Sequence, residues 1–205
     1  MKSYRKNILI IGAGGMLARA VIERGSNEDE ITGVDLPEFD LTDREQVLAH
    51  VKENTPDLII NCAAYTDVDG CESNTELAMQ VNGTGVEHLA EAAKTCQATL
   101  VHISTDYVFS GESDSPYSEE SETSPRSTYG LSKLAGEQAI QNSGLDNYYI
   151  IRTSWLYGPG GRNFVETMLR LATERENLRV VADQVGAPTF TADLADAIFH
   201  LIDQK

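Results

Sequence analysis

Cysteine is scarce in this sequence of 205 residues, which contains three of them: Cys62, Cys71 and Cys96. An odd number of cysteines, with none at metal-ligand spacing, argues against a disulfide scaffold and against a zinc site. Cys62 ends an apolar run and is predicted to be a small core residue. We therefore expect reduced thiols, no bound metal and a cytoplasmic location.

Long apolar runs are missing as well. The basic segment Met1–Lys6 is followed by an apolar run of only Ile8–Ile11. Such a run is too short for the hydrophobic part of a signal peptide or for a membrane span. The sequence thus predicts neither a targeting segment nor a membrane partner.

Positive charge is in short supply, because 16 Lys and Arg against 32 Asp and Glu give a net charge of -16. A surface with this excess repels phosphates, which argues against nucleic acid as a partner. Some of the acidic residues cluster in Ser118–Glu122, within the polar stretch Ser110–Arg126, which contains two prolines. This composition predicts a long solvated loop, and such loops in compact domains often border a functional site.

Short apolar runs alternate with amphipathic stretches along the chain. The runs are rich in Ile, Val and Leu, which is typical of strands covered on both faces. The alternation predicts an α/β fold: a Rossmann-like, doubly wound parallel sheet with helices on both faces, in one NAD(P)-binding domain over residues 1–205. The expected strands are Asn7–Ile11, Ile31–Val34, Asp57–Asn61, Thr99–Ser104, Tyr148–Thr153 and Arg179–Val181. The expected helices are Met16–Arg24, Arg44–Glu53, Glu76–Thr95, Thr128–Asn142, Phe164–Glu174 and Thr191–Ile202.

A glycine-rich turn follows the first expected strand. Gly12 permits a tight turn, Gly15 lets a pyrophosphate approach the backbone, and Ala18 is small enough for the helix to lie close to the sheet. The helix that begins with Met16 and Leu17 presents free N–H groups to the phosphates. This pattern predicts a dinucleotide site.

An acidic residue stands where the adenosine half of a dinucleotide would lie. Asp35 ends the second strand, 20 residues beyond Gly15, and would bind the ribose hydroxyls. A carboxylate there repels a 2′-phosphate, which favours NADH over NADPH. Asp40 and Leu41 would lie against the adenine; a capping role for Asp40 or Thr42 is an equally good reading.

Tyr129 and Lys133 are four residues apart and share one face of an expected helix. Reduction of a ketone needs a proton for the new alkoxide, and a nearby ammonium lowers the pKa of a tyrosine toward the working range. Ser104 and Thr105 stand at the end of an apolar strand, where open parallel sheets place their active sites, and either hydroxyl could hydrogen-bond the substrate carbonyl. Asp106 could instead cap a turn.

Six stretches carry a resemblance that goes beyond these motifs. They are Asn61–Asp69, Val101–Phe109, Tyr129–Glu137, Ile151–Gly158, Asn163–Ala172 and Asp183–Thr189. Each resembles a string of the dTDP-4-dehydrorhamnose reductases, which belong to the extended short-chain dehydrogenase/reductase superfamily. The resemblance implies a Rossmann-fold oxidoreductase of dTDP-rhamnose biosynthesis. It would use NADH or NADPH to reduce the C4 ketone of dTDP-4-dehydro-L-rhamnose, giving dTDP-L-rhamnose.

The resemblance also implies roles for individual residues. Thr105 and Tyr129 would polarise and protonate the sugar ketone, and Lys133 would tune Tyr129 and hold the nicotinamide ribose. The residues expected to flank the cofactor are Ala63, Ala64 and Thr66. Those expected to line the sugar pocket are Asp106, Tyr107 and Trp155. For Trp155 a packing role is an even alternative.

Two departures from the family pattern bear on activity. The chain stops at Lys205, so the C-terminal substrate-binding region of the family is expected to be largely absent, which would weaken substrate binding and turnover. The positions of the family's metal-binding glutamates are Ala20 and Ala192 here, so a homodimer would form without a metal. Two other functions stay open: another nucleotide-sugar reductase or epimerase, and a non-catalytic, dinucleotide-binding regulatory protein on the same fold.

Overall fold

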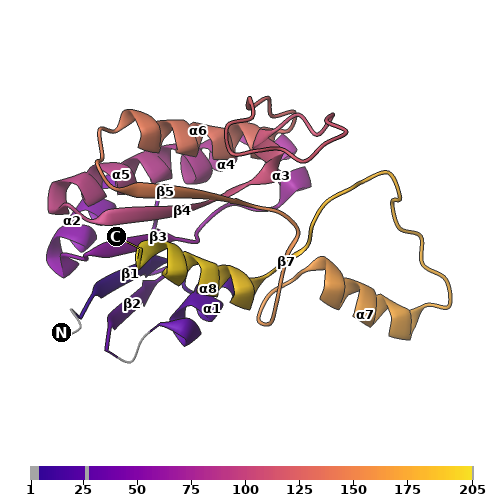
Figure 1. Ribbon diagram of the computed structural model, residues 1–205, viewed down its shortest axis with the longest axis horizontal. Helices are drawn as coiled ribbons and strands as arrows, with labels where there is room; N and C mark the ends of the chain where they lie inside the picture. Colours follow the sequence, from indigo (N-terminus) through magenta and orange to yellow (C-terminus); the bar gives the residue numbers. More distant parts are fainter. Residues whose placement is uncertain (1–4, 26–27, 205) are drawn as a thin grey trace.

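A computed structural model describes residues 5–25 and 28–204 of the chain. Part of the basic segment Met1–Lys6, and Lys205, lie outside these residues. A parallel sheet of five strands forms the centre of the molecule, in the order β2-β1-β3-β4-β5 (Figure 1). The strands are β1 (Asn7–Ile11), β2 (Glu30–Val34), β3 (Leu58–Asn61), β4 (Thr99–Thr105) and β5 (Tyr148–Thr153). The predicted α/β fold, with its doubly wound parallel sheet, is confirmed.

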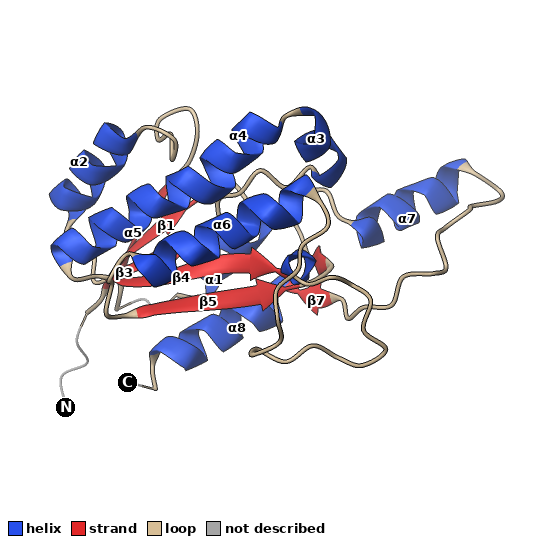
Figure 2. Cartoon of the chain, turned by 90° about the horizontal axis from the view of Figure 1, so that it is seen from above, coloured by secondary structure: helices blue, strands red, loops and turns tan. Residues whose placement is uncertain are grey.

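Helices cover both faces of the sheet, and two hydrophobic cores result (Figure 2). Successive side chains of a strand point to opposite faces. Leu9 and Ile11 therefore join one core, while Ile8 and Ile10 join the other. The first core lies under α2 (Arg44–Asn54), α5 (Gly85–Cys96) and α6 (Thr128–Asn142), and the second under α1 (Met16–Arg24) and α8 (Thr191–Ile202). Strands buried on both faces explain why their sequences lack polar alternation.

The predicted long helix Glu76–Thr95 is interrupted. It consists of α4 (Thr75–Met79), a π-helical turn over Gln80–Thr84 and α5. The buried Asn82 sits in this turn, where its amide accepts a hydrogen bond from Tyr65 N (2.8 Å) and donates one to Tyr65 O (3.0 Å). A side chain that binds a distant loop in this way favours a local irregularity that helical periodicity does not reveal.

A short helix, α3 (Val68–Ser73), was not predicted. The Asp67 carboxylate caps it by accepting a hydrogen bond from Gly70 N. Six residues are too few for a helical repeat to appear in the sequence.

The predicted strand Arg179–Val181 is wrong. This segment has no regular structure, and Val180 and Val181 are 50% and 68% exposed. The additional strands are instead a two-residue pair, β6 (Leu156–Tyr157) and β7 (Thr189–Phe190). Between them α7 (Phe164–Glu174) projects from the body of the molecule (Figure 1). An apolar run forms a strand only where a neighbouring strand takes up its backbone hydrogen bonds.

Within residues 5–25 and 28–204, no helix combines the length and the hydropathy needed to span a membrane.

Candidate functional site

The glycine turn lies at the carboxyl end of β1 and leads into α1. Gly12 has φ of +78°, and a Cβ at this position would stand 2.7 Å from the backbone nitrogen of Ala63. The left-handed conformation and the close approach of the chain after β3 both require glycine. Gly15 is the N-cap of α1 and has no side chain to cover the free N–H groups of its first turn.

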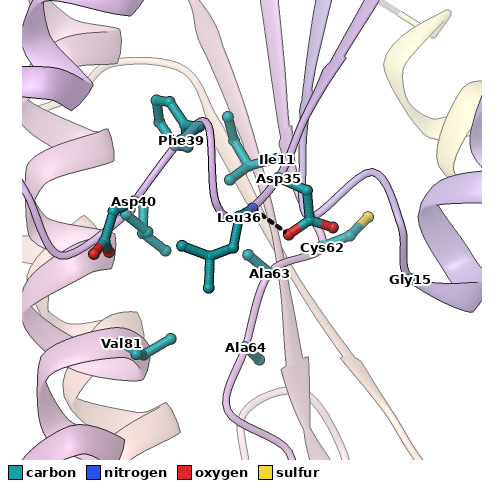
Figure 3. A pocket seen from close by; sticks show the side chains of 12 residues that line it. Ile11, Gly15, Asp35, Leu36, Phe39, Asp40, Cys62, Ala63, Ala64 and Val81 are labelled. Atoms are coloured by element: carbon teal, nitrogen blue, oxygen red, sulfur yellow. Dashed lines mark hydrogen bonds between the residues drawn. The ribbon is translucent and has the colours of Figure 1, made fainter.

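Asp35 ties the second strand to the glycine turn. Its carboxylate accepts hydrogen bonds from Gly14 N (2.8 Å) and from Leu36 N (2.9 Å, Figure 3). The acidic group is therefore held at the edge of the sheet where the adenosine ribose of a dinucleotide would lie.

A cavity of about 210 Å³ opens at this edge of the sheet (Figure 3). It gathers most of the residues predicted to bind a cofactor: Gly12, Gly15, Asp35, Asp40, Leu41, Ala63 and Ala64. Its apolar wall also includes Leu36, Phe39 and Val81, which the sequence did not point to. The apolar residues in the stretch after Asp35 could have indicated this wall, since an adenine ring packs against apolar side chains.

Asp40 has a local role as well as a place in the cavity wall. Its carboxylate accepts hydrogen bonds from the amide and the hydroxyl of Thr42, at 2.9 and 2.7 Å. The N-cap of α2 is Asp43, which accepts a hydrogen bond from Gln46 N, so neither Asp40 nor Thr42 caps this helix.

Five residues that were predicted to bind the cofactor do not line the cavity: Met16, Leu17, Thr66, Tyr129 and Lys133. Leu17 is 4% exposed and belongs to the core under α1 and α8. The Met16 sulfur lies 3.6 Å from the amide nitrogen of Asn163, which places it beside the loop before α7. Thr66 is exposed. For Met16 and Leu17 a contact through the backbone N–H groups of α1 stays a prediction.

Tyr129 stands in the first turn of α6, which begins beside the end of β4. The Ser127 hydroxyl accepts a hydrogen bond from Gly130 N and caps the helix. Glu72, on α3, accepts hydrogen bonds from the amide and the hydroxyl of Thr128, both at 2.8 Å. A Cβ on Gly130 would overlap the carbonyl oxygen of Tyr107, so glycine lets the helix approach the chain after β4.

The predicted catalytic tyrosine is brought together with the residues that follow β4. The rings of Tyr107 and Tyr129 form an edge-to-face pair with centroids 5.5 Å apart. Burial raises the pKa of Tyr129 to about 12, opposed by a hydrogen bond with the Thr105 side chain. The Thr105 hydroxyl also donates to the Asp106 carboxylate at 3.1 Å, and burial raises the pKa of that carboxyl.

Lys133 is buried, and its amine contacts β4. Its Nζ donates to the carbonyl oxygen of Ile103 at 2.7 Å and lies 3.3 Å from His102 Nε2. Burial lowers the pKa of Lys133 to about 8. Burial is the largest influence on the pKa of Tyr129 and raises it, so the lowering of this pKa by Lys133 stays a prediction.

Comparison with known proteins places this arrangement in a family. Residues 6–205 match the family described as the RmlD substrate binding domain. A dTDP-4-dehydrorhamnose reductase of Streptomyces griseus is 46% identical over 201 residues, which are 96% of this chain and 65% of that protein. A second, from Mycobacterium tuberculosis, is 41% identical over 99% of this chain and 68% of its own length.

Solved structures agree with the sequence comparison. The crystal structure of the dTDP-4-dehydrorhamnose reductase of Bacillus anthracis, in complex with NADP, aligns with a TM-score of 0.95 at 44% identity, covering 98% of this chain and 71% of that one. The chain belongs to the dTDP-4-dehydrorhamnose reductase family. The resemblance noted in the sequence is thereby confirmed, and the chain spans about two thirds of the length of these relatives.

In this member of the dTDP-4-dehydrorhamnose reductase family, Trp155 lies beside the loop before β7. It has φ of +47° and is 44% exposed, and a Cβ on Gly186 would stand 2.8 Å from its ring. The Ser154 hydroxyl holds the same loop by donating to Ala187 O at 2.7 Å. Trp155 therefore packs on one side while the rest of its ring stays accessible to a ligand.

The positions aligned with the metal-binding glutamates of the dTDP-4-dehydrorhamnose reductase family offer no ligand side chain. Ala20 is buried in the core, and Ala192 contributes its carbonyl oxygen to a hydrogen bond from Arg24 Nε (3.2 Å). In the described part of the chain, no group of three or more His, Cys, Asp or Glu side chains is arranged to hold a metal ion.

Proposed function

We propose that this chain carries the cofactor and proton-transfer parts of an NAD(P)H-dependent reductase. The reaction is reduction of the C4 ketone of dTDP-4-dehydro-L-rhamnose to dTDP-L-rhamnose. The observation that carries the proposal is that α6 brings Tyr129 against Tyr107, directly after Thr105 at the carboxyl end of β4, on a sheet whose glycine turn suits a pyrophosphate. Open parallel sheets bind their ligands at this end of the strands.

A nicotinamide cofactor held at the glycine turn would supply the hydride for the ketone carbon, and residues of this chain act on the ketone oxygen. The Thr105 hydroxyl donates a hydrogen bond to the carbonyl oxygen and orients it. Tyr129 gives its proton to that oxygen as negative charge develops. The raised pKa of Tyr129 keeps its phenol protonated at neutral pH, which suits a proton donor.

The sugar would lie against residues that follow β4 and β5. We assign Asp106, Tyr107 and Trp155 to this pocket. Tyr107 contacts Tyr129 directly, and the rings of Tyr107 and Trp155 are partly exposed. The amphipathic ring of Trp155 suits a sugar face. Any homodimer would form without the family's metal site, and the cytoplasmic location expected from the sequence stays a prediction.

An NAD(P)H oxidation assay with dTDP-4-dehydro-L-rhamnose tests the proposal. We expect substrate-dependent loss of absorbance of the reduced cofactor. A second substrate, dTDP-4-keto-6-deoxy-D-glucose, covers the other nucleotide-sugar function, because a Streptomyces niveus relative named dTDP-4-keto-6-deoxy-D-glucose reductase is 44% identical. Saturable cofactor binding with no turnover of either substrate would favour the non-catalytic alternative, and no cofactor binding would refute the proposal.

Cofactor choice is a separate prediction. We expect the Kd for NADH to be about tenfold below that for NADPH, ~1.4 kcal/mol, because the Asp35 carboxylate faces the cavity and repels a 2′-phosphate. Arg19, on α1, brings a positive charge to the glycine turn, where its Nε donates to Gly14 O at 3.1 Å, and this charge favours a 2′-phosphate. The relative from Bacillus anthracis was solved with NADP. The cofactor preference of this chain therefore depends on whether the charge of Asp35 or that of Arg19 dominates.

Titration by cofactor fluorescence, with NADH and NADPH in parallel, measures this preference. Asp35→Asn should abolish it, and Asp40→Asn, at the same cavity but engaged with Thr42, should leave it intact. Using the ratio of the two Kd values removes any general loss of affinity. Tighter binding of NADPH by the unchanged protein would contradict the prediction.

A further inference from the structure

We propose that Asn61 and His102 are positioning residues for Lys133, and that their hydrogen bonds hold the Lys133 amine uncharged beside the His102 ring. The inference rests on the proposed function, in which Tyr129 donates the proton, and concerns Lys133, to which the family resemblance gives roles at Tyr129 and at the nicotinamide ribose. Neither Asn61 nor His102 is needed for the chemistry proposed above.

The three side chains form a buried line across three elements. Asn61 ends β3, His102 lies in β4 and Lys133 lies on α6. Asn61 and His102 are 0% exposed and Lys133 is 1% exposed. Asn61 Nδ2 lies 3.1 Å from His102 Nδ1, and His102 Nε2 lies 3.3 Å from Lys133 Nζ. Water has no access to the line, so each group must find its partners within it.

The backbone fixes the orientation of the Asn61 amide. Its Oδ1 accepts a hydrogen bond from Ala63 N at 3.1 Å, so its Nδ2 faces the His102 ring as a donor. His102 Nδ1 must therefore accept. Burial is the largest cause that holds the pKa of His102 well below its usual value, and it acts whether or not Lys133 is charged, so the ring is neutral. A neutral ring with an accepting Nδ1 carries its proton on Nε2.

A proton on His102 Nε2 determines the protonation state that Lys133 can adopt beside it. An ammonium group has three donors and no acceptor, so it would oppose the Nε2–H donor. An uncharged amine has one lone pair, which accepts from Nε2–H, and two N–H groups, one of which donates to Ile103 O at 2.7 Å. The observed contacts are satisfied only by the uncharged amine.

The groups that face Lys133 are compatible with an uncharged amine. Glu137, one turn further along α6, favours the ammonium, but its carboxylate is bound by Arg152 and by the Ser104 hydroxyl. Cys62, at the end of β3, stays a neutral thiol because burial raises its pKa to about 12. Burial lowers the pKa of Lys133 to about 8, so the amine predominates above that pH and the ammonium below it.

Protonation of Lys133 therefore breaks its contact with His102. Once charged, the side chain is free to leave β4 for the position near Tyr129 and the nicotinamide ribose that the family resemblance implies for it. Asn61 and His102 thus set the pH range over which Lys133 leaves this position.

Nitrogen NMR of the intact, unliganded protein, labelled at histidine with 15N, tests the tautomer directly. The signals of His102 are assigned among the four histidines by their loss in His102→Gln. At pH about 9 we expect a protonated Nε2 and an unprotonated Nδ1. As the pH falls, the Nε2 signal should move with a midpoint near 8 while the ring stays neutral. A proton on Nδ1, or an imidazolium ring at neutral pH, would overturn the inference.

Asn61→Asp reverses the order of hydrogen-bond donors and acceptors along this line, with almost no change in the shape of the side chain. The carboxylate accepts from Ala63 N and also from His102 Nδ1–H, so Nε2 loses its proton and accepts from a Lys133 ammonium. We expect the tautomer to invert and the titration midpoint of Lys133, followed by its 13Cε shift, to rise by at least about one pH unit. The pH profile of cofactor oxidation should move in the same direction, which a purely structural defect would not produce.

Asn82→Asp is the matched control. It places the same charge on another buried asparagine, which bonds Tyr65 and Ser132 rather than His102. The His102 tautomer should stay as in the unchanged protein; inversion in this control would overturn the inference. If Asn61→Asp does not fold, the His102 tautomer measured in the unchanged protein still tests the inference. These readings need no turnover, so a failure of the proposed reaction and a failure of this inference are distinguishable.

Discussion

Tyr129→Phe is expected to lower the rate of ketone reduction by about 10²- to 10⁴-fold while leaving the Kd for NADH nearly unchanged. The substitution removes only the phenolic hydroxyl, which is the proposed proton donor. The ring keeps its edge-to-face contact with Tyr107 and its place in the first turn of α6, so the fold and the glycine turn are undisturbed.

Single-turnover cofactor oxidation, paired with a fluorescence titration of NADH, measures both quantities. Tyr148→Phe, in β5 and outside the site, removes a hydroxyl of the same kind and should retain the full rate. If Tyr129→Phe kept most of its activity, the proton would have to come from Asp106 or from water. A loss of NADH affinity of similar size to the loss of rate would show that Tyr129 acts in binding instead.

The second large effect is on stability. Glu137→Ala should lower the free energy of unfolding by about 3–5 kcal/mol, because it leaves the Arg152 guanidinium without its partner. Glu137 is 1% exposed and Arg152 is 22% exposed, and Arg152 Nε donates to Glu137 Oε1 at 3.0 Å. The Ser104 hydroxyl donates to the same carboxylate at 2.5 Å. Together with Ser104, the pair joins α6 to β4 and β5, next in sequence to Thr105, which is proposed to act on the substrate.

Urea unfolding followed by circular dichroism measures the change as a shift of the midpoint at constant slope. Glu174→Ala is the control, because its partner Arg170 is an exposed neighbour on α7 and such pairs contribute little. If Glu137→Ala shifted the unfolding midpoint no more than the control does, the prediction would be wrong. Water and the Phe109 ring, over which the Arg152 guanidinium lies, would then be sufficient partners for Arg152.

Local sequence patterns predicted most elements because those elements have local causes. The bounds of α1, α6, α7 and α8 match the prediction residue for residue. The strands of the sheet were recognisable from their apolar residues, since both faces are covered. The interruption of the helix around Asn82 was not predicted, because Asn82 bonds a loop distant in the sequence. The strand predicted at Arg179–Val181 is absent, because a strand also needs a neighbouring strand, which the local sequence does not reveal.

By itself the sequence determined the five strands of the central sheet and most of the helices, the glycine turn with Asp35, and the family. These follow from residue types at short spacing, which act through local conformation and through burial. Only the tertiary structure decided which way Lys133 points and how its neighbours set the charge it carries. That outcome depends on Asn61 and His102, which lie on separate strands and meet Lys133 in an interior without water. The spacing of Tyr129 and Lys133 places them on one helix face, but the donors and acceptors packed around a buried amine decide where it bonds.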